Sequence, residues 1–174
     1  ADHRLAHDLA SSTGELLLEL RRAWRDASQA ERKAAGDQRA HRFILDRLVA
    51  QRPNDPIRSE ESSAAENHQL SPAERGAGRE WIIDPLDGTR EFAELDRNDW
   101  AVHVALCIDG HPVVGAVALP AQGRVLSTLD PPSTPLLPTA ATVVVSRSRP
   151  PREAVHVAEV LDAQLLPMGS AGAK

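Results

Sequence analysis

The sequence is most informative at Trp81-Ile82-Ile83-Asp84-Pro85-Leu86-Asp87-Gly88-Thr89. Its apolar start predicts a buried strand, and two aspartates follow directly. Because Asp84 and Asp87 are three residues apart, a single turn brings both carboxylates to one side, where the Leu86 carbonyl can join them. Two carboxylates and a carbonyl form the all-oxygen ligand set that Mg²⁺ prefers. Gly88 permits close backbone approach, and the amides of Gly88 and Thr89 can bind an anion where a helix begins. The stretch therefore predicts a loop that binds metal and phosphate.

Three other interpretations of this loop fit its spacing less well. A calcium-binding helix-loop-helix would need acidic residues at Ile83 and Pro85, so it is excluded. The haloacid dehalogenase phosphatases use Asp-x-Asp-Gly-Thr, whereas this chain has Asp-x-x-Asp-Gly-Thr. The extra residue displaces one carboxylate, which disfavours that interpretation but leaves it open. A plain Asp-Gly turn is disfavoured because a second aspartate, a strand and an upstream acidic pair accompany it.

Two acidic positions upstream can complete such a site. Glu60 and Glu61 end a short strand predicted over 56–61, and they fit either a solvated charge pair or a source of a third metal carboxylate. Asp37 stands at the start of a helix predicted over 37–52, where a carboxylate can cap free amide groups. On the residues alone, both readings of each position stay open.

The rest of the chain reads as alternating helices and strands. Apolar residues recur at helical intervals in the first 25 residues, and Asp109-Gly110 is a strong hairpin signal between two apolar runs. The central strands are expected to form an antiparallel meander, and 62–79 is expected to be a loop or a broken helical turn. The predicted helices are 5–25, 37–52 and 152–162, and the predicted strands are 56–61, 80–83, 100–108, 112–119, 124–129, 142–146 and 165–168.

A change in composition predicts a domain boundary. Prolines crowd the stretch from 130 to 139, and the strand-helix-strand pattern beyond it suggests a second α/β unit. We therefore expect an N-terminal α+β metal-binding domain over 1–130, a proline-rich linker over 131–140, and the start of a C-terminal α/β domain over 141–174.

Composition excludes several classes of function. The formal net charge of −5 argues against a partner that is a nucleic acid polymer, because such proteins present a basic face. It does not exclude a small phosphorylated substrate, since divalent metals invert the charge of an acidic pocket. No apolar run is long enough to cross a membrane. The start, Ala1-Asp2-His3-Arg4, lacks a signal-peptide profile, and the single cysteine, Cys107, cannot form an internal disulfide, so a cytoplasmic location is expected.

Several motifs together resemble the inositol monophosphatase superfamily. The signature is Ser59-Glu60-Glu61-Ser62 followed by the stretch from Trp81 to Thr89. The continuation Arg90-Glu91-Phe92 is similar to the CysQ branch, the 3′(2′),5′-bisphosphate nucleotidases. Asp99-Trp100-Ala101-Val102-His103 and Gly169-Ser170-Ala171-Gly172-Ala173-Lys174 resemble the actinobacterial members of that branch. The resemblance covers nearly the whole chain.

This resemblance implies a fold and a metal site. The fold is the layered sugar-phosphatase fold of the α/β class, in which an α+β first domain with an antiparallel sheet precedes a second α/β domain, incomplete here. Two to three Mg²⁺ ions are implied as cofactors. The resemblance assigns Glu60, Asp84 and the carbonyl of Leu86 to the first ion, and Asp84 and Asp87 to the second. Glu60 would also lie near a third, weaker ion.

It also implies the groups that act on the substrate. Thr89 and Asp37 would form a hydrogen-bonded pair that helps to activate the attacking water, and the amides of Gly88 and Thr89 would bind the phosphate. The segment at the end of the chain would contact the substrate. The implied substrate-binding residues are Asp87, Gly88, Thr89, Ser170 and Lys174.

The implied activity is hydrolysis of a phosphate monoester. The resemblance favours the 3′-phosphate of adenosine 3′,5′-bisphosphate, or of its sulfated relative, in sulfur assimilation, with inhibition by lithium. Phosphatases of inositol 1-phosphate, fructose 1,6-bisphosphate or histidinol phosphate are alternatives within the enzyme class. A non-catalytic metal- or phosphate-binding remnant is the alternative from another class. Homodimers are common in the family, so a homodimer is possible here.

Two departures from the family pattern affect these expectations. Gly36 stands where the family often has threonine ahead of the aspartate matched to Asp37. The family also takes a further metal aspartate from a downstream Trp-Asp motif, which this sequence lacks. We therefore expect that these 174 residues are not the whole working enzyme.

Three basic residues receive no firm role. His103 lies in an apolar predicted strand and is expected to be a core residue with satisfied hydrogen bonds. Arg147 and Arg149 follow the proline-rich stretch and fit either a surface that faces an anionic substrate or a solvated strand end.

Overall fold

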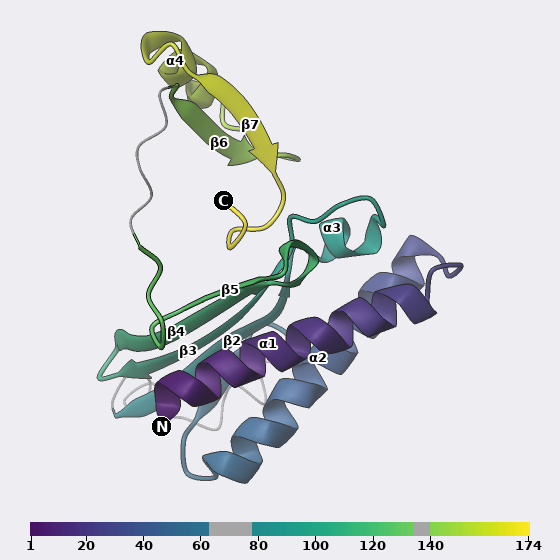
Figure 1. Ribbon diagram of the computed structural model, residues 1–174, viewed down its shortest axis with the longest axis vertical. Helices are drawn as coiled ribbons and strands as arrows, with labels where there is room; N and C mark the ends of the chain where they lie inside the picture. The colour runs from purple at the N-terminus through teal and green to yellow at the C-terminus, as the bar shows by residue number, and fades with distance from the viewer. Residues whose placement is uncertain (63–77, 134–139) are drawn as a thin grey trace.

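The computed structural model describes residues 1–62, 78–133 and 140–174 (Figure 1). Two long helices, α1 (Asp2–Ala23) and α2 (Gln29–Gln51), lie side by side against one face of a five-stranded sheet. The strands of this sheet are β1 (Ile57–Ser59), β2 (Arg79–Asp87), β3 (Ala101–Ile108), β4 (His111–Leu119) and β5 (Arg124–Ser127). The short helices α3 (Thr89–Ala93) and η2 (Pro120–Gln122) follow β2 and β4.

The sheet has the order β1-β2-β3-β4-β5. β1 pairs with β2 in parallel, and the other neighbours are antiparallel, which confirms the predicted meander. The β3–β4 hairpin turns at Asp109 and Gly110, both with positive φ, as the Asp-Gly signal indicates. The sheet thus brings the end of β2, with its aspartates, beside the start of β3.

Apolar side chains from the helices and the inner face of the sheet form one core. α1 packs across β3 and β4, and α2 packs on β2 and α3. The largest fully buried side chains in this core include Trp81, Trp100, Phe92, Ile44 and Leu48. Because this packing fixes α2 against β2, residues on the inner face of α2 have defined positions relative to Asp84 and Asp87.

The start predicted for the second helix is wrong. The helix begins at Gln29, so Asp37 lies two turns inside it and does not cap it. The cap is Ser28, whose hydroxyl accepts from the Glu31 amide while the Glu31 carboxylate accepts from the Ser28 amide. Arg32 further anchors this first part of the helix, since its guanidinium donates to backbone carbonyls that include Ala93 O.

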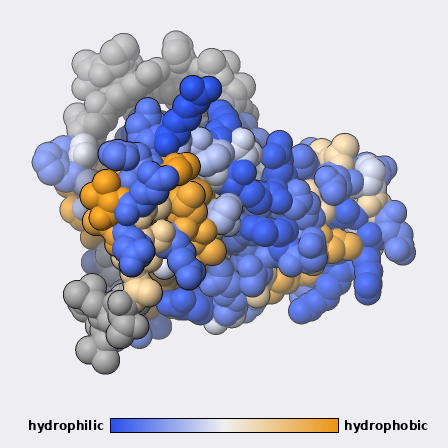
Figure 2. Space-filling view, turned by 90° about the horizontal axis from the view of Figure 1, so that it is seen from above, coloured by the Kyte–Doolittle hydropathy of each residue, from blue (hydrophilic) through white to orange (hydrophobic). Residues whose placement is uncertain are grey.

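A smaller unit follows the five-stranded sheet. It contains β6 (Thr142–Ser146), α4 (Glu153–Val160) and β7 (Gln164–Met168), in the predicted order of strand, helix and strand, and β6 and β7 are parallel. Figure 2 shows apolar side chains gathered on this unit. Its large exposed apolar residues are Val155, Val157, Val160, Leu161, Leu165 and Leu166.

Ion pairs join Arg147 of this unit to α3 and to Glu94, the residue that follows α3. Arg147 Nη2 lies 2.7 Å from Glu91 Oε1, and Arg147 Nη1 lies 2.7 Å from Glu94 Oε2. The hydrogen bonds that Arg147 donates to Glu94, and the charges of both glutamates, raise the pKa of the Arg147 side chain. The anionic partners of Arg147 in this structure are therefore protein carboxylates, whereas Arg149 is exposed.

The fold class expected from the sequence is confirmed as mixed α and β with a largely antiparallel sheet. The division into domains 1–130, 131–140 and 141–174 stays a prediction. Most of the loop expected over 62–79 and of the linker lies outside the described residues. Cys107 is a buried free cysteine, as predicted. Within the described ranges, the helices lack the combination of length and apolar character needed to cross a membrane.

Candidate metal and phosphate site

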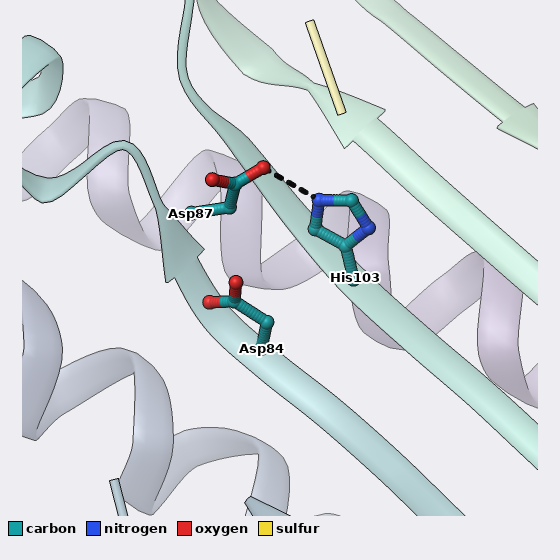
Figure 3. Close-up of side chains that lie close together, drawn as sticks. All are labelled: Asp84, Asp87 and His103. Carbon is teal, nitrogen blue, oxygen red and sulfur yellow. Dashed lines mark hydrogen bonds and ion pairs between the residues drawn. The ribbon is translucent and has the colours of Figure 1, made fainter. Parts of the chain in front are cut away.

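The acidic loop, residues 84–89, lies where β2 passes the start of β3. The expected turn after Ile83 is wrong, because β2 continues to Asp87 and both aspartates lie inside the strand at a register shift. Asp84 is opposite His103 in the antiparallel register, and the register shifts between Asp84 and Asp87, which is paired with Ala101. One ligand atom from each of Asp84, Asp87 and His103 lies within 4.8 Å of the others. Figure 3 shows the two carboxylates and the imidazole converging from the adjacent strands. The structure therefore brings together the two loop aspartates predicted from the sequence.

The carboxylate of Asp87 is held by several donors. His103 Nε2 lies 2.9 Å from Asp87 Oδ2, and the Gly172 amide donates to the same oxygen at 2.8 Å. Burial alone would raise the pKa of Asp87, but hydrogen bonds from His103, Gly172, Ser170 and Ala171 hold it well below its usual range. The pKa of His103 is raised in turn, because the hydrogen bond and charge of Asp87 outweigh its burial. Asp87 is thus an ionised, oriented carboxylate.

Asp84 has the opposite electrostatic environment. Burial, a side-chain hydrogen bond with Glu60 and the charges of Glu60 and Asp87 together raise the pKa of Asp84 to about 8. Carboxylates crowd together at such cost where a cation compensates them, and an all-oxygen set suits Mg²⁺. The donor set of Glu60, Asp84 and Asp87 therefore fits a divalent ion. These side chains line a cavity of about 700 Å³.

Asp37 and Thr89 meet across the interface between α2 and α3. Thr89 Oγ1 lies 3.2 Å from Asp37 Oδ1 and 3.1 Å from the Leu86 carbonyl oxygen. Burial and the charge of Glu61 raise the pKa of Asp37 to about 6. The structure therefore brings together the catalytic pair implied by the family resemblance, although Asp37 reaches Thr89 from the middle of its helix.

Gly88 occupies a conformation that favours glycine. Its φ is 84°, and a Cβ there would lie 3.0 Å from the Ser170 side chain and 3.3 Å from the carbonyl oxygen of Asp99. The left-handed backbone redirects the chain from β2 into α3. Phosphate binding by the amides of Gly88 and Thr89 stays a prediction.

The segment after β7 returns to this loop (Figure 1). Ser170 is buried, and its hydroxyl accepts from the Ala173 amide at 2.9 Å. Lys174 Nζ donates to the carbonyl oxygens of Gly169 at 2.7 Å and Ser170 at 3.0 Å. The structure thus places Ser170 beside Gly88, whereas the Lys174 amine bonds to its own segment, and a substrate contact by either residue stays a prediction.

Sequence reasoning missed three contributors to this site. His103 was expected to be a core residue, but it bonds to Asp87; Gly172 bonds to the same carboxylate, and Asp99 holds the adjacent backbone of Gly169. The contact of His103 had no local signal in the sequence, because it depends on the pairing of β2 with β3. For Gly172 and Asp99 the sequence offered no local signal.

Comparison with curated proteins identifies similar phosphatases. The chain is 40% identical over 186 residues to the 3′-phosphoadenosine 5′-phosphate phosphatase of Mycobacterium leprae, covering 99% of this chain and 66% of that protein. It is 42% identical over 149 residues to the protein of that name from Mycobacterium tuberculosis, covering 80% of this chain and 54% of the relative. It is 34% identical over 97 residues to the 3′(2′),5′-bisphosphate nucleotidase CysQ of Escherichia coli, covering 55% of this chain and 37% of the relative. The chain therefore spans between about a third and two thirds of the length of these relatives.

Solved structures show the same fold. Inositol monophosphatase II of Staphylococcus aureus superposes with a TM-score of 0.74 at 20% identity, covering 96% of this chain and 66% of that one. SuhB of Mycobacterium tuberculosis superposes with a TM-score of 0.67 at 24% identity, covering 97% of this chain and 69% of that one. The model of the inositol monophosphatase family matches residues 3–131, which include the acidic loop and the Asp37–Thr89 pair. This chain belongs to the inositol monophosphatase family.

Proposed function

We propose that the protein is a Mg²⁺-dependent phosphatase that removes the 3′-phosphate of adenosine 3′,5′-bisphosphate or of its sulfated relative, in sulfur assimilation. The observation that carries this proposal is the acidic cluster of Glu60, Asp84 and Asp87 beside the Asp37–Thr89 pair. The choice of substrate rests on the names of the mycobacterial relatives and on the motif Arg90-Glu91-Phe92.

The acidic residues have separate parts in holding the metal. Glu60, Asp84 and the Leu86 carbonyl would hold one Mg²⁺, and Asp84 and Asp87 would hold a second, with a third, weaker ion near Glu60. Bound Mg²⁺ supplies positive charge that stabilises phosphoryl transfer. The low pKa of Asp87 favours an ionised carboxylate ready to bind a cation, whereas Asp84, with a pKa of about 8, would have to lose its proton first.

The Asp37–Thr89 pair acts on the attacking water in this proposal. When the Thr89 hydroxyl donates to Asp37, its oxygen is free to accept a hydrogen bond from water and to orient it. Asp37 has a pKa of about 6, so its carboxylate can act as a base near neutral pH. The amides of Gly88 and Thr89 would face the phosphate, and Ser170 and Lys174 would contact the rest of the substrate.

Phosphate release is the direct test of this proposal. We expect Mg²⁺-dependent release from adenosine 3′,5′-bisphosphate, loss of activity in excess chelator, and inhibition by Li⁺. Asp84→Asn should abolish release, and Asp46→Asn, an exposed carboxylate paired with Arg42, is the matched control. Full activity in chelator would contradict the metal role.

Parallel assays separate the remaining alternatives. Inositol 1-phosphate, fructose 1,6-bisphosphate and histidinol phosphate should be hydrolysed more slowly than the nucleotide. Faster turnover of any of them would reassign the substrate. Binding of Mg²⁺ and phosphate without turnover of any substrate would favour a non-catalytic role.

Three further proposals accompany this function. They are the division into two domains joined by a linker, a cytoplasmic location and a homodimer. Sedimentation measures the oligomeric state directly, and a monomer at assay concentrations would remove the homodimer from the proposal.

A further inference from the structure

The segment Asp99–His103 has no part in the function proposed above, yet it touches the acidic loop from two directions. His103 bonds directly to Asp87 Oδ2. Asp99 bonds to the start of the segment Gly169–Lys174, whose Gly172 amide reaches the same oxygen. The two ends of this short segment therefore converge on one carboxylate atom.

The contact from His103 is direct and sterically defined. His103 Nε2 lies 2.9 Å from Asp87 Oδ2, and the carboxylate oxygen accepts this hydrogen bond when Nε2 carries the proton. The imidazole is confined by Gly172, because a Cβ on that residue would lie 2.6 Å from Nε2. Glycine thus lets the backbone of the second unit approach close enough for both donors to share Asp87 Oδ2.

The contact from Asp99 passes through the backbone. The Asp99 residue is 3% exposed, and Arg97 donates to both of its carboxylate oxygens. Asp99 Oδ2 accepts from the Gly169 amide at 2.7 Å, and its carbonyl oxygen accepts from the Ser170 amide at 3.2 Å. These two bonds fix the turn that leads to Gly172. Because the buried Asp99 carboxylate is held by these hydrogen bonds, it restricts the position of the turn that begins at Gly169.

We propose that Asp99 and His103 are positioning residues that orient the Asp87 carboxylate, His103 directly and Asp99 through the turn from Gly169 to Gly172. This inference rests on the proposed role of Asp87 in holding metal. Two donors on one oxygen restrict rotation of the carboxylate, so that the ligand atoms of Asp84 and Asp87 stay close together.

Calorimetric titration with Mg²⁺ alone tests the consequence for metal binding. His103→Leu and Asp99→Ala should each weaken Mg²⁺ binding by about tenfold to 100-fold, as loss of such supporting contacts does elsewhere. His103→Gln keeps a donor near the position of Nε2 and should retain most of the affinity. Asp99→Asn keeps an acceptor for the Gly169 amide and should therefore lose less Mg²⁺ affinity than Asp99→Ala. The matched controls are His111→Leu and Asp46→Asn, which alter exposed residues and should leave affinity unchanged.

Hydrogen exchange of the Gly172 amide in metal-free protein tests the orientation itself. It should accelerate at least several-fold in His103→Leu and in Asp99→Ala, and the double variant should exchange little faster than the faster single variant, because both act on one contact. If Asp99→Ala does not fold, Asp99→Asn supplies the comparison.

The two measurements separate this inference from the function on which it rests. Wild-type protein that binds no Mg²⁺ would refute the proposed metal role, and Gly172 exchange would then still decide whether the two residues orient Asp87. Unchanged exchange in the variants of both residues, or Mg²⁺ affinity equal to that of wild type, would overturn the inference.

Discussion

Gly36 sets how closely α2 approaches the acidic loop, and replacing it with alanine should disturb the Asp37–Thr89 pair. A Cβ at Gly36 would lie 2.7 Å from Phe92 Cε1 and 2.8 Å from Leu86 Cδ2. Phe92 is fully buried and packs edge-on against Trp100, with ring centroids 5.2 Å apart. Because neither neighbour has free space, the helix must move to accept the methyl group.

The size of the effect follows from these contacts. Restoring ordinary contact requires a movement of about 0.7 Å. The hydrogen bond from Thr89 to Asp37 is already 3.2 Å long, so such a movement can break it. Overpacking costs about 1–3 kcal/mol, and the better helix propensity of alanine returns about 1 kcal/mol. We therefore expect Gly36→Ala to lower the free energy of unfolding by about 1 kcal/mol and to slow phosphate release at least tenfold.

Urea unfolding and phosphate-release assays on the same preparations measure both effects. Ala34→Gly is the matched control, because Ala34 is exposed on the same helix and this change isolates helix propensity. Ala34→Gly should lower the free energy of unfolding by about 1 kcal/mol and leave the rate of phosphate release unchanged. A Gly36→Ala protein that is more stable than wild type and equally active would refute the reasoning, since it would show that the close contact at Gly36 does not position Asp37.

Three further predictions address other parts of the molecule. Asp87→Asn should abolish phosphate release while the protein still folds, but with a lower melting temperature, because the low pKa of Asp87 means that its charge also stabilises the folded state; near-normal release would contradict this. Burial alone would raise the pKa of Asp55, but hydrogen bonds from Arg79 and Trp81 lower it. Ionised Asp55 therefore stabilises the folded protein above its pKa in the unfolded chain, and this stabilisation is lost as the pH falls through its pKa in the folded protein. Asp55→Asn should therefore lower the free energy of unfolding by about 1.5–3 kcal/mol at pH 7 and by progressively less below about pH 4. An equal loss at pH 7 and below pH 4 in urea unfolding would rule this out. Ser28→Ala removes the cap of α2 and should lower the free energy of unfolding by about 1 kcal/mol in the same urea experiment.

The sheet and the acidic loop were predictable from local sequence. Strands β3 and β4 are apolar runs separated by Asp109-Gly110, and that turn signal requires no knowledge of distant residues. The acidic loop is equally local, because its ligand-bearing residues lie within a few positions of each other. The family signature adds Glu60 and Asp37, which composition and periodicity alone leave ambiguous.

The start of α2 was missed for a specific physical reason. Residues 29–36 carry few large apolar side chains, so helical periodicity of hydrophobic residues is weak there. The capping box formed by Ser28 and Glu31 was nevertheless readable in the sequence. The buried Arg32, which satisfies backbone carbonyls of the preceding turn, replaces the missing apolar anchor.

The contacts of His103 and Gly172 could not be deduced from a single sequence. They depend on the register between β2 and β3 and on where the chain returns after β7. A shift of one residue in that register would turn His103 to the other face of the sheet. Such long-range geometry is set by packing over the whole sheet, and no motif of a few residues encodes it.

The same register explains why the two loop aspartates are three residues apart. In a regular strand, residues separated by three positions point to opposite faces, so Asp84 and Asp87 would diverge. The register shift between them changes this alternation, and both carboxylates then face His103. Pro85 lies inside the shift, where its missing amide hydrogen costs no regular ladder bond. An Asp-x-Asp spacing would place two carboxylates on one face of a strand without any irregularity. The register shift in β2 therefore accommodates the extra residue of Asp-x-x-Asp, whereas the Asp-x-Asp spacing of the haloacid dehalogenase pattern would need no such irregularity in a strand.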